Sequence, residues 1–143
     1  MPIGLLEDDA AIQEMLRLVL QDEGYAVTVF STADAALQAL IGPEQTAPMP
    51  LPIDLLIVDW RLQGSISGTE VIRRLRGVPE LQTLPIILTT AASFNEIPAL
   101  QDLHLSFLEK PFEVDQMVDL VRTLLQSQSQ SQSRSQPDPE PTS

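Results

Sequence analysis

Cysteine is absent from the 143-residue chain, and lysine and histidine occur once each, as Lys110 and His104. Without cysteine the chain can form no disulfide framework, thiolate metal site or cysteine nucleophile. Cations are scarce as well, because 8 Lys and Arg residues stand against 20 Asp and Glu residues, for a formal net charge of -12 at pH 7. Such a polyanion repels DNA and anionic lipid, so direct binding to nucleic acid or membrane is not expected.

Long apolar runs are also absent. No stretch approaches the roughly 20 apolar residues that span a bilayer, and the N-terminus lacks the basic segment of a signal peptide. The cytoplasm is therefore the expected compartment. The length and a hydrophobic content of 43% suit one domain. The Ser/Gln alternation and Pro-rich end bury too little surface to fold, which predicts a folded domain over residues 1–125 and a disordered tail or the start of a linker over 126–143.

The most regular feature is a run of apolar residues from Leu55 to Val58 that ends in Asp59. A short run without polar residues is typical of a strand buried on both faces, as in a parallel sheet. Similar runs alternate with stretches of helical periodicity. The expected strands are 3–6, 26–30, 55–58, 86–88 and 106–108, and the expected helices are 12–20, 32–41, 71–75, 97–103 and 114–125. This (βα)5 order predicts an α/β fold with a doubly wound, five-stranded parallel sheet and helices on both faces.

Local signals mark the helix ends. Asp9 is the expected N-cap of the first helix and Ser31 that of the second, because short polar side chains accept hydrogen bonds from free N–H groups. Arg73, Arg74 and Arg76 gather at the end of the third helix, where cations suit the helix dipole. We interpret this arginine cluster as a feature of the helix end and not as a phosphate site.

Polar side chains follow four of the five expected strands: Glu7 and Asp8, Asp59, Thr90 and Lys110. Because the carboxyl ends of parallel strands share one edge of the sheet, these residues are expected to converge there. Crowded carboxylates favour a hard divalent cation, and Mg²⁺ prefers oxygen ligands. A hydroxyl and an ammonium beside them suit the oxygens of a phosphoryl group, with the central aspartate as a nucleophile that forms an acyl phosphate.

In this order and on these strand ends, Glu7-Asp8, Asp59, Thr90-Ala91 and Lys110-Pro111 resemble the receiver domain of two-component response regulators. The resemblance extends over about residues 3–125 and implies a CheY-like domain with a flavodoxin-like fold. It implies that Asp59 is the phosphoacceptor.

The resemblance also assigns roles to the surrounding residues. The implied Mg²⁺ ligands are three carboxylates and one backbone carbonyl, those of Glu7, Asp8, Asp59 and Arg61, respectively. The Thr90 hydroxyl, favoured over that of Thr89, and the Lys110 ammonium are expected to contact the phosphoryl group. Thr90 is then a switch residue, and Phe107 matches the aromatic switch position, with a plain core role as the alternative. Trp60 is expected to be a lid beside the site that reports on metal binding.

The implied function is signalling and not enzymatic turnover of a substrate. The domain is expected to take a phosphoryl group from a sensor histidine kinase or a phosphotransfer protein, in a Mg²⁺-dependent step, and to signal to a downstream protein. Because only the tail follows Leu125, signalling is expected to proceed through protein contacts or through onward transfer of phosphate. A piece of a longer regulator is the alternative.

Three features depart from the family pattern. Asp59 and Gly68 are nine positions apart, one more than is usual, and Gln63 stands where proline is common. This insertion predicts a bulged loop in which the Arg61 carbonyl is displaced. The stretch from Thr90 to Lys110 is about two residues short, which predicts an abbreviated fourth helix, and the loop over 42–53 is longer than typical. These departures motivate a second hypothesis, a receiver-like binding module that works without phosphorylation.

Two other readings fail on single positions. A phosphatase of the haloacid dehalogenase type needs a second aspartate two residues after the nucleophile, where this chain has Arg61. A flavodoxin-like cofactor binder needs a Ser/Thr/Gly phosphate loop after the first strand, where this chain has Glu7-Asp8-Asp9.

Overall fold

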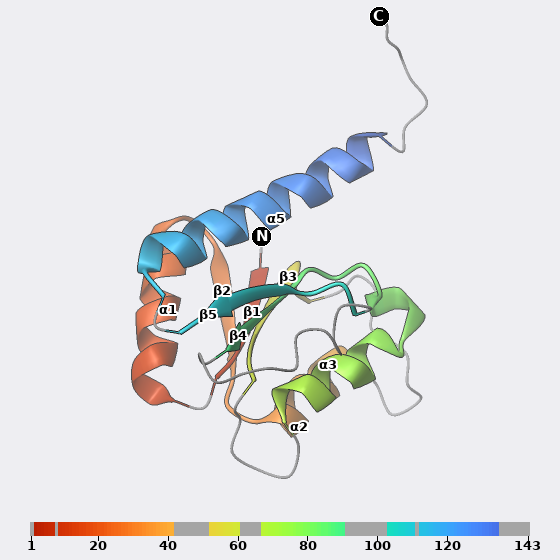
Figure 1. Cartoon of the computed structure of the whole chain (residues 1–143), viewed down its shortest axis with the longest axis horizontal. Coiled ribbons are helices and arrows are strands. Elements are labelled where there is room, and N and C mark those ends of the chain that lie inside the picture. Colours follow the sequence, from red (N-terminus) through yellow and green to blue (C-terminus); the bar gives the residue numbers. More distant parts are fainter. Residues whose placement is uncertain are drawn as a thin grey trace, which may run out of the picture.

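A five-stranded parallel sheet forms the centre of the molecule (Figure 1). The computed structural model describes residues 2–7, 9–41, 52–60, 67–90, 103–110 and 112–134. The strands are β1 (Pro2–Leu6), β2 (Ala26–Phe30), β3 (Leu55–Asp59), β4 (Ile86–Thr90) and β5 (Ser106–Glu109). They lie in the order β2-β1-β3-β4-β5, and every neighbouring pair is parallel. The predicted doubly wound parallel sheet is confirmed.

Helices cover both faces of this sheet (Figure 1). Within the described residues they are α1 (Ala10–Asp22), α2 (Ala33–Leu40), α3 (Gly68–Arg76), α5 (Val114–Arg134) and the 3-10 turn η1 (Pro79–Leu81). The α1 and α5 helices share one face, and α2 and α3 share the other. None of the described helices is both long and apolar enough to cross a membrane. The short fourth helix expected over 97–103 lies, apart from Leu103, outside the described residues.

The apolar core is divided by the sheet into two clusters. Alternate residues of β3 contribute to opposite clusters: Leu56 and Val58 pack toward α2 and α3, whereas Leu55 and Ile57 pack toward α1 and α5. All five residues of β3 are buried, as expected for the middle strand of a sheet covered on both sides. Burial of the whole strand explains why its sequence shows no polar alternation.

Polar side chains cap both α1 and α2, but only one of the two predicted capping residues is correct. The Asp9 carboxylate accepts hydrogen bonds from the N–H groups of Ala11 and Ile12, so its predicted capping role is confirmed. The predicted cap Ser31 is wrong, because α2 is capped by Thr32, whose hydroxyl accepts from the N–H of Ala35 at 3.1 Å. Both residue types cap well, and the helix begins one residue later than the pattern suggested.

The last helix is longer than predicted. We expected disorder from Gln126 onward, but α5 continues to Arg134 and extends away from the body of the domain (Figure 1). Gln is a good helix former and Ser is tolerated, and adding residues to an existing helix costs much less than starting one. The helix therefore ends at Arg134, beyond the expected end at Leu125, whereas 135–143 lie outside the described residues. The boundary between domain and tail stays a prediction.

Gly68 begins α3 in direct contact with the end of β3. Its N–H donates to the carbonyl of Trp60 at 3.2 Å. A Cβ atom at this position would lie 2.9 Å from the Trp60 Cα and 3.0 Å from the Asp59 carbonyl carbon, and closer still to the Asp59 carbonyl oxygen. Glycine is therefore required by the close approach of two backbones. The contact fixes both ends of the segment between Asp59 and Gly68, which are nine positions apart.

Gly68→Ala is expected to lower the free energy of unfolding by about 3 kcal/mol or more, because the neighbouring atoms are backbone and cannot rotate away. Urea denaturation measures this change. The matched control is Gly77→Ala at the other end of α3, where a Cβ meets nothing closer than 3.4 Å and φ is -74°. The control is expected to change stability by less than about 1 kcal/mol. Equal effects of the two substitutions would contradict the close-approach explanation.

Candidate phosphoacceptor site

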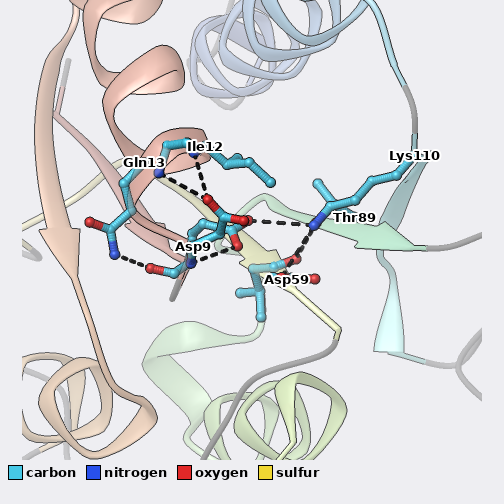
Figure 2. A network of polar contacts seen from close by, with 9 residues as sticks. Asp9, Ile12, Gln13, Asp59, Thr89 and Lys110 are labelled. Carbon is cyan, nitrogen blue, oxygen red and sulfur yellow. Dashed lines mark hydrogen bonds and ion pairs between the residues drawn. The ribbon is translucent and has the colours of Figure 1, made fainter.

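Three strand ends bring polar side chains together at one edge of the sheet. Asp59 ends β3, Glu7 directly follows β1, and Lys110 directly follows β5. The Lys110 Nζ lies 3.2 Å from the Asp59 Oδ2 and 3.7 Å from the Glu7 Oε1. Figure 2 shows the Lys110 side chain reaching toward Asp59, with Asp9 and Gln13 on the opposite side of the site. The structure thus brings together three of the predicted site residues.

Both carboxyl groups are removed from water, since Glu7 is 2% and Asp59 is 4% exposed. Burial, a hydrogen bond to Asp59 and the charge of Asp59 together raise the pKa of Glu7 from 4.5 to about 7, with burial as the largest cause. The Lys110 charge and the N–H of Asp9, which donates to Glu7 Oε2 at 3.2 Å, act in the opposite direction. One ammonium therefore does not balance two buried carboxylates, and Glu7 is about half protonated near pH 7.

The excess of carboxyl groups over cations indicates whether a metal ion would fit the site. Two buried carboxyl groups offer hard oxygen ligands, and together they can carry more negative charge than the single ammonium of Lys110 balances, which are the conditions that favour Mg²⁺. Glu7 and Asp59 therefore fit a divalent cation. The other two predicted ligands, Asp8 and the Arg61 carbonyl, lie outside the described residues, as do the predicted bulge of the loop over 61–66 and most of the loop over 42–53.

The two threonines at the end of β4 are placed differently. Thr89 pairs in register with Asp59, and its hydroxyl donates to the Val58 carbonyl at 3.4 Å. Thr90 is the last residue of β4 and is 3% exposed, and its carbonyl accepts from the N–H of Lys110 at 2.6 Å. Thr90 is thus the threonine joined to the Lys110 backbone. The preference for its hydroxyl as the phosphoryl contact stays a prediction.

The aromatic residues near the site share one cluster. Trp60 and Phe107 are both partly buried and pack against the α2/α3 side of the core. Trp60 directly follows Asp59, and its N–H donates to the Thr89 carbonyl at 3.0 Å. Phe107 lies on β5, which is an edge strand of the sheet. A partly buried aromatic on an edge strand suits the position of a switch residue, and the role stays a prediction.

Two contacts that hold Glu7 were not foreseen from the sequence. The Gln13 side chain donates to the Glu7 backbone carbonyl, and the Asp9 N–H binds the Glu7 carboxylate (Figure 2). Both come from the start of α1, which places the first turn of this helix against the site. The only available signal was proximity in sequence, since Gln13 lies one helical turn after the capping residue.

The Lys110 side chain is also accessible from outside. It is 27% exposed and lines a pocket of about 370 Å³ together with Ile12, Met15 and Phe112. The Lys110 side chain therefore lies between the buried carboxylates, which its ammonium contacts, and a pocket at the surface.

The fold and this edge of the sheet define a receiver domain. The sequence profile of the response regulator receiver domain matches residues 3–122, so the chain belongs to this family of phosphoacceptor signalling domains. The predicted resemblance to receiver domains is confirmed.

The chain is also similar to individual proteins of known family. The chain is 34% identical over 126 residues to the phosphate regulon transcriptional regulatory protein PhoB of Rhizobium meliloti, covering 87% of this chain and 52% of PhoB. It is 30% identical over 128 residues to the transcriptional regulatory protein FixJ of Bradyrhizobium diazoefficiens, covering 87% of this chain and 56% of FixJ. A crystal structure of a response regulator receiver protein from Sinorhizobium medicae superposes with a TM-score of 0.73 at 25% identity, covering 88% of this chain and 94% of that one. The chain thus spans about half the length of the two curated relatives.

The raised pKa of Glu7 predicts a pH dependence of stability in metal-free buffer. Between about pH 4.5 and about pH 7 the folded protein holds a proton that the unfolded chain has released, so unfolding releases a proton there. The free energy of unfolding should therefore fall as pH rises across this window, by about 3 kcal/mol at most from this group. Glu7→Gln should remove this contribution and leave the variant more stable than the wild type at pH 8.

Urea denaturation at half-unit pH steps with a chelator present measures both effects. Glu80→Gln, which removes an exposed acid in η1, is the charge-matched control. An unchanged pH profile in Glu7→Gln would show that the proton is not held by this residue.

Proposed function

We propose that the chain accepts a phosphoryl group on the Asp59 carboxylate. The observation that carries this proposal is the ammonium of Lys110, 3.2 Å from a buried Asp59 oxygen at the carboxyl edge of the sheet. An oxygen of Asp59 attacks the phosphorus, a phosphorus–oxygen bond forms, and the bond from phosphorus to the donor breaks with its electron pair leaving on the donor. The product is a mixed anhydride of the aspartate.

The residues around Asp59 have separate parts in this step. Lys110 neutralises the oxygens of the incoming phosphoryl group, and the buried position of Asp59 limits competing water. Glu7, together with Asp8, Asp59 and the Arg61 carbonyl, would hold Mg²⁺, which when bound neutralises phosphoryl charge. We assign to Thr90 a hydrogen bond to the phosphoryl group and to Phe107 the accompanying change at β5.

The partners follow from the same chemistry. A protein that carries a labile phosphoryl group, a sensor histidine kinase or a phosphotransfer protein, would supply the group. The phosphoryl group is a local change of charge, which would shift the balance between two conformations around Thr90 and β5. A downstream protein would bind one of these conformations in preference to the other. The net charge of -12 supports a protein partner over nucleic acid.

Incubation with acetyl phosphate and Mg²⁺ tests the proposal. The intact mass should rise by one phosphoryl group, and the gain should be lost in Asp59→Asn and in the presence of a chelator. Fluorescence of Trp60, the one tryptophan of the chain, should change on addition of Mg²⁺ in parallel. No mass gain in the wild type would contradict the proposal and favour the phosphorylation-independent binding module.

The two threonines give a second test. Thr90→Ala should slow the gain of phosphoryl mass by about tenfold, less than the roughly 10²–10³-fold loss caused by removing a fully preorganised donor. Thr89→Ala is the matched control, because it removes the same atoms from the neighbouring position and loses only a long hydrogen bond to Val58. It should stay within about twofold of the wild type. A larger effect at Thr89 than at Thr90 would reverse the assignment.

A further inference from the structure

Arg76 differs from the two arginines that precede it in α3. Arg73 and Arg74 are exposed, and Arg74 pairs with Glu70 on the same helix at 3.1 Å. Arg76 is partly buried, and burial lowers the pKa of its guanidinium from its ordinary value. A partly buried cation needs strong partners, and the partners here are not carboxylates.

The Arg76 guanidinium binds three backbone carbonyls. Nε donates to Leu103 at 2.8 Å, Nη1 to Leu81 at 2.6 Å and Nη2 to His104 at 3.2 Å. Leu81 ends η1, ahead of β4, and the other two residues lie two and three positions before β5. Hydrogen bonds from a charged donor are roughly twice as strong as neutral ones, and the planar guanidinium fixes their directions. One side chain thus joins α3, the approach to β4 and the approach to β5.

The backbone conformation at His104 is unusual where the Arg76 guanidinium binds it. His104 has φ of 57°, in the left-handed region that residues other than glycine adopt infrequently. Its carbonyl and that of Leu103 accept from the same guanidinium. The Arg76 contacts therefore hold the chain in an unfavourable backbone conformation shortly before it enters the sheet.

Within the described residues, β5 is a four-residue edge strand that pairs only with β4, and Leu103 and Leu105 before it pack against the α2/α3 side of the core. Its carboxyl end is fixed by Lys110, whose N–H binds the Thr90 carbonyl and whose ammonium binds Asp59. Arg76 at one edge of the sheet and Lys110 at the other are thus charged anchors at the two ends of β5, separated by about 13 Å of strand.

We infer that Arg76 is a positioning residue for the phosphoacceptor site, which fixes the amino end of β5 and thereby the reach of Lys110 to Asp59. The effect on phosphoryl transfer rests on the function proposed above, whereas the anchoring of β5 does not. Arg76 does not contact the reacting atoms and acts through the strand.

Hydrogen exchange of Arg76→Met tests the anchoring without any phosphodonor. Amides of residues 103–109 should exchange at least about tenfold faster than in the wild type, while those of β1 and β3 should be little changed. Arg73→Met, the same substitution at an exposed position of the helix, is the control and should leave all strands unchanged. Equal acceleration in every strand, or none at residues 103–109, would overturn the inference.

Arg76→Lys guards against loss of folding in the methionine variant. It keeps the charge, but a single ammonium cannot reproduce the planar fork to three carbonyls. Exchange at residues 103–109 should be intermediate between the wild type and Arg76→Met. Exchange identical to the wild type would show that charge alone suffices and would contradict the positioning role.

A double-mutant cycle with Lys110→Met tests the coupling to the site. Arg76→Met alone should slow phosphoryl gain from acetyl phosphate by about threefold to tenfold, and in the Lys110→Met background it should slow it no further. Independent multiplication of the two effects would contradict action through Lys110. If the wild type gains no phosphoryl group, the proposed function fails, and hydrogen exchange alone decides whether Arg76 anchors β5.

Discussion

The contact between Lys110 and Asp59 joins the ends of two strands that are not neighbours, since β4 lies between β3 and β5. The carboxyl groups of Asp59 and Glu7 are buried, so the free energy of each charge depends on the other charges present. Glu7 competes for the same ammonium at 3.7 Å, and two carboxyl groups cannot both be balanced by one cation. The net charge at this edge of the sheet therefore decides which groups are stable there. Binding of a proton, of a metal ion or of a phosphoryl group each changes that net charge.

Much of this edge could be predicted from the sequence, because the prediction needed only topology. Short apolar runs ending in polar residues identify buried strands, and parallel strands place those ends together whatever their separation in sequence. Glu7, Asp59 and Lys110 lie far apart along the chain, yet they meet as that argument required. The Asp9 cap was equally predictable, because a capping side chain binds N–H groups two and three residues away.

Other features depend on information that no local pattern contains. Arg73, Arg74 and Arg76 look alike in the sequence, and only the orientation of the helix decides which one meets carbonyls 27 and 28 residues later. The choice between Ser31 and Thr32 depended on where the first turn of α2 closes, and both residues cap well. The length of α5 was missed because a polar tract has no apolar periodicity, although its residues tolerate a helix once one has begun.

The hydrogen bond from Gly68 to the Trp60 carbonyl also has a consequence for the variation of this domain in evolution. It closes the chain between β3 and α3 at fixed ends, so each added residue carries the entropic cost of closing a longer loop. That cost grows slowly, by about 0.6 kcal/mol for each doubling of loop length. The entropic cost of one more residue beside the phosphoacceptor is thus small, whereas Gly68 itself is not free to vary.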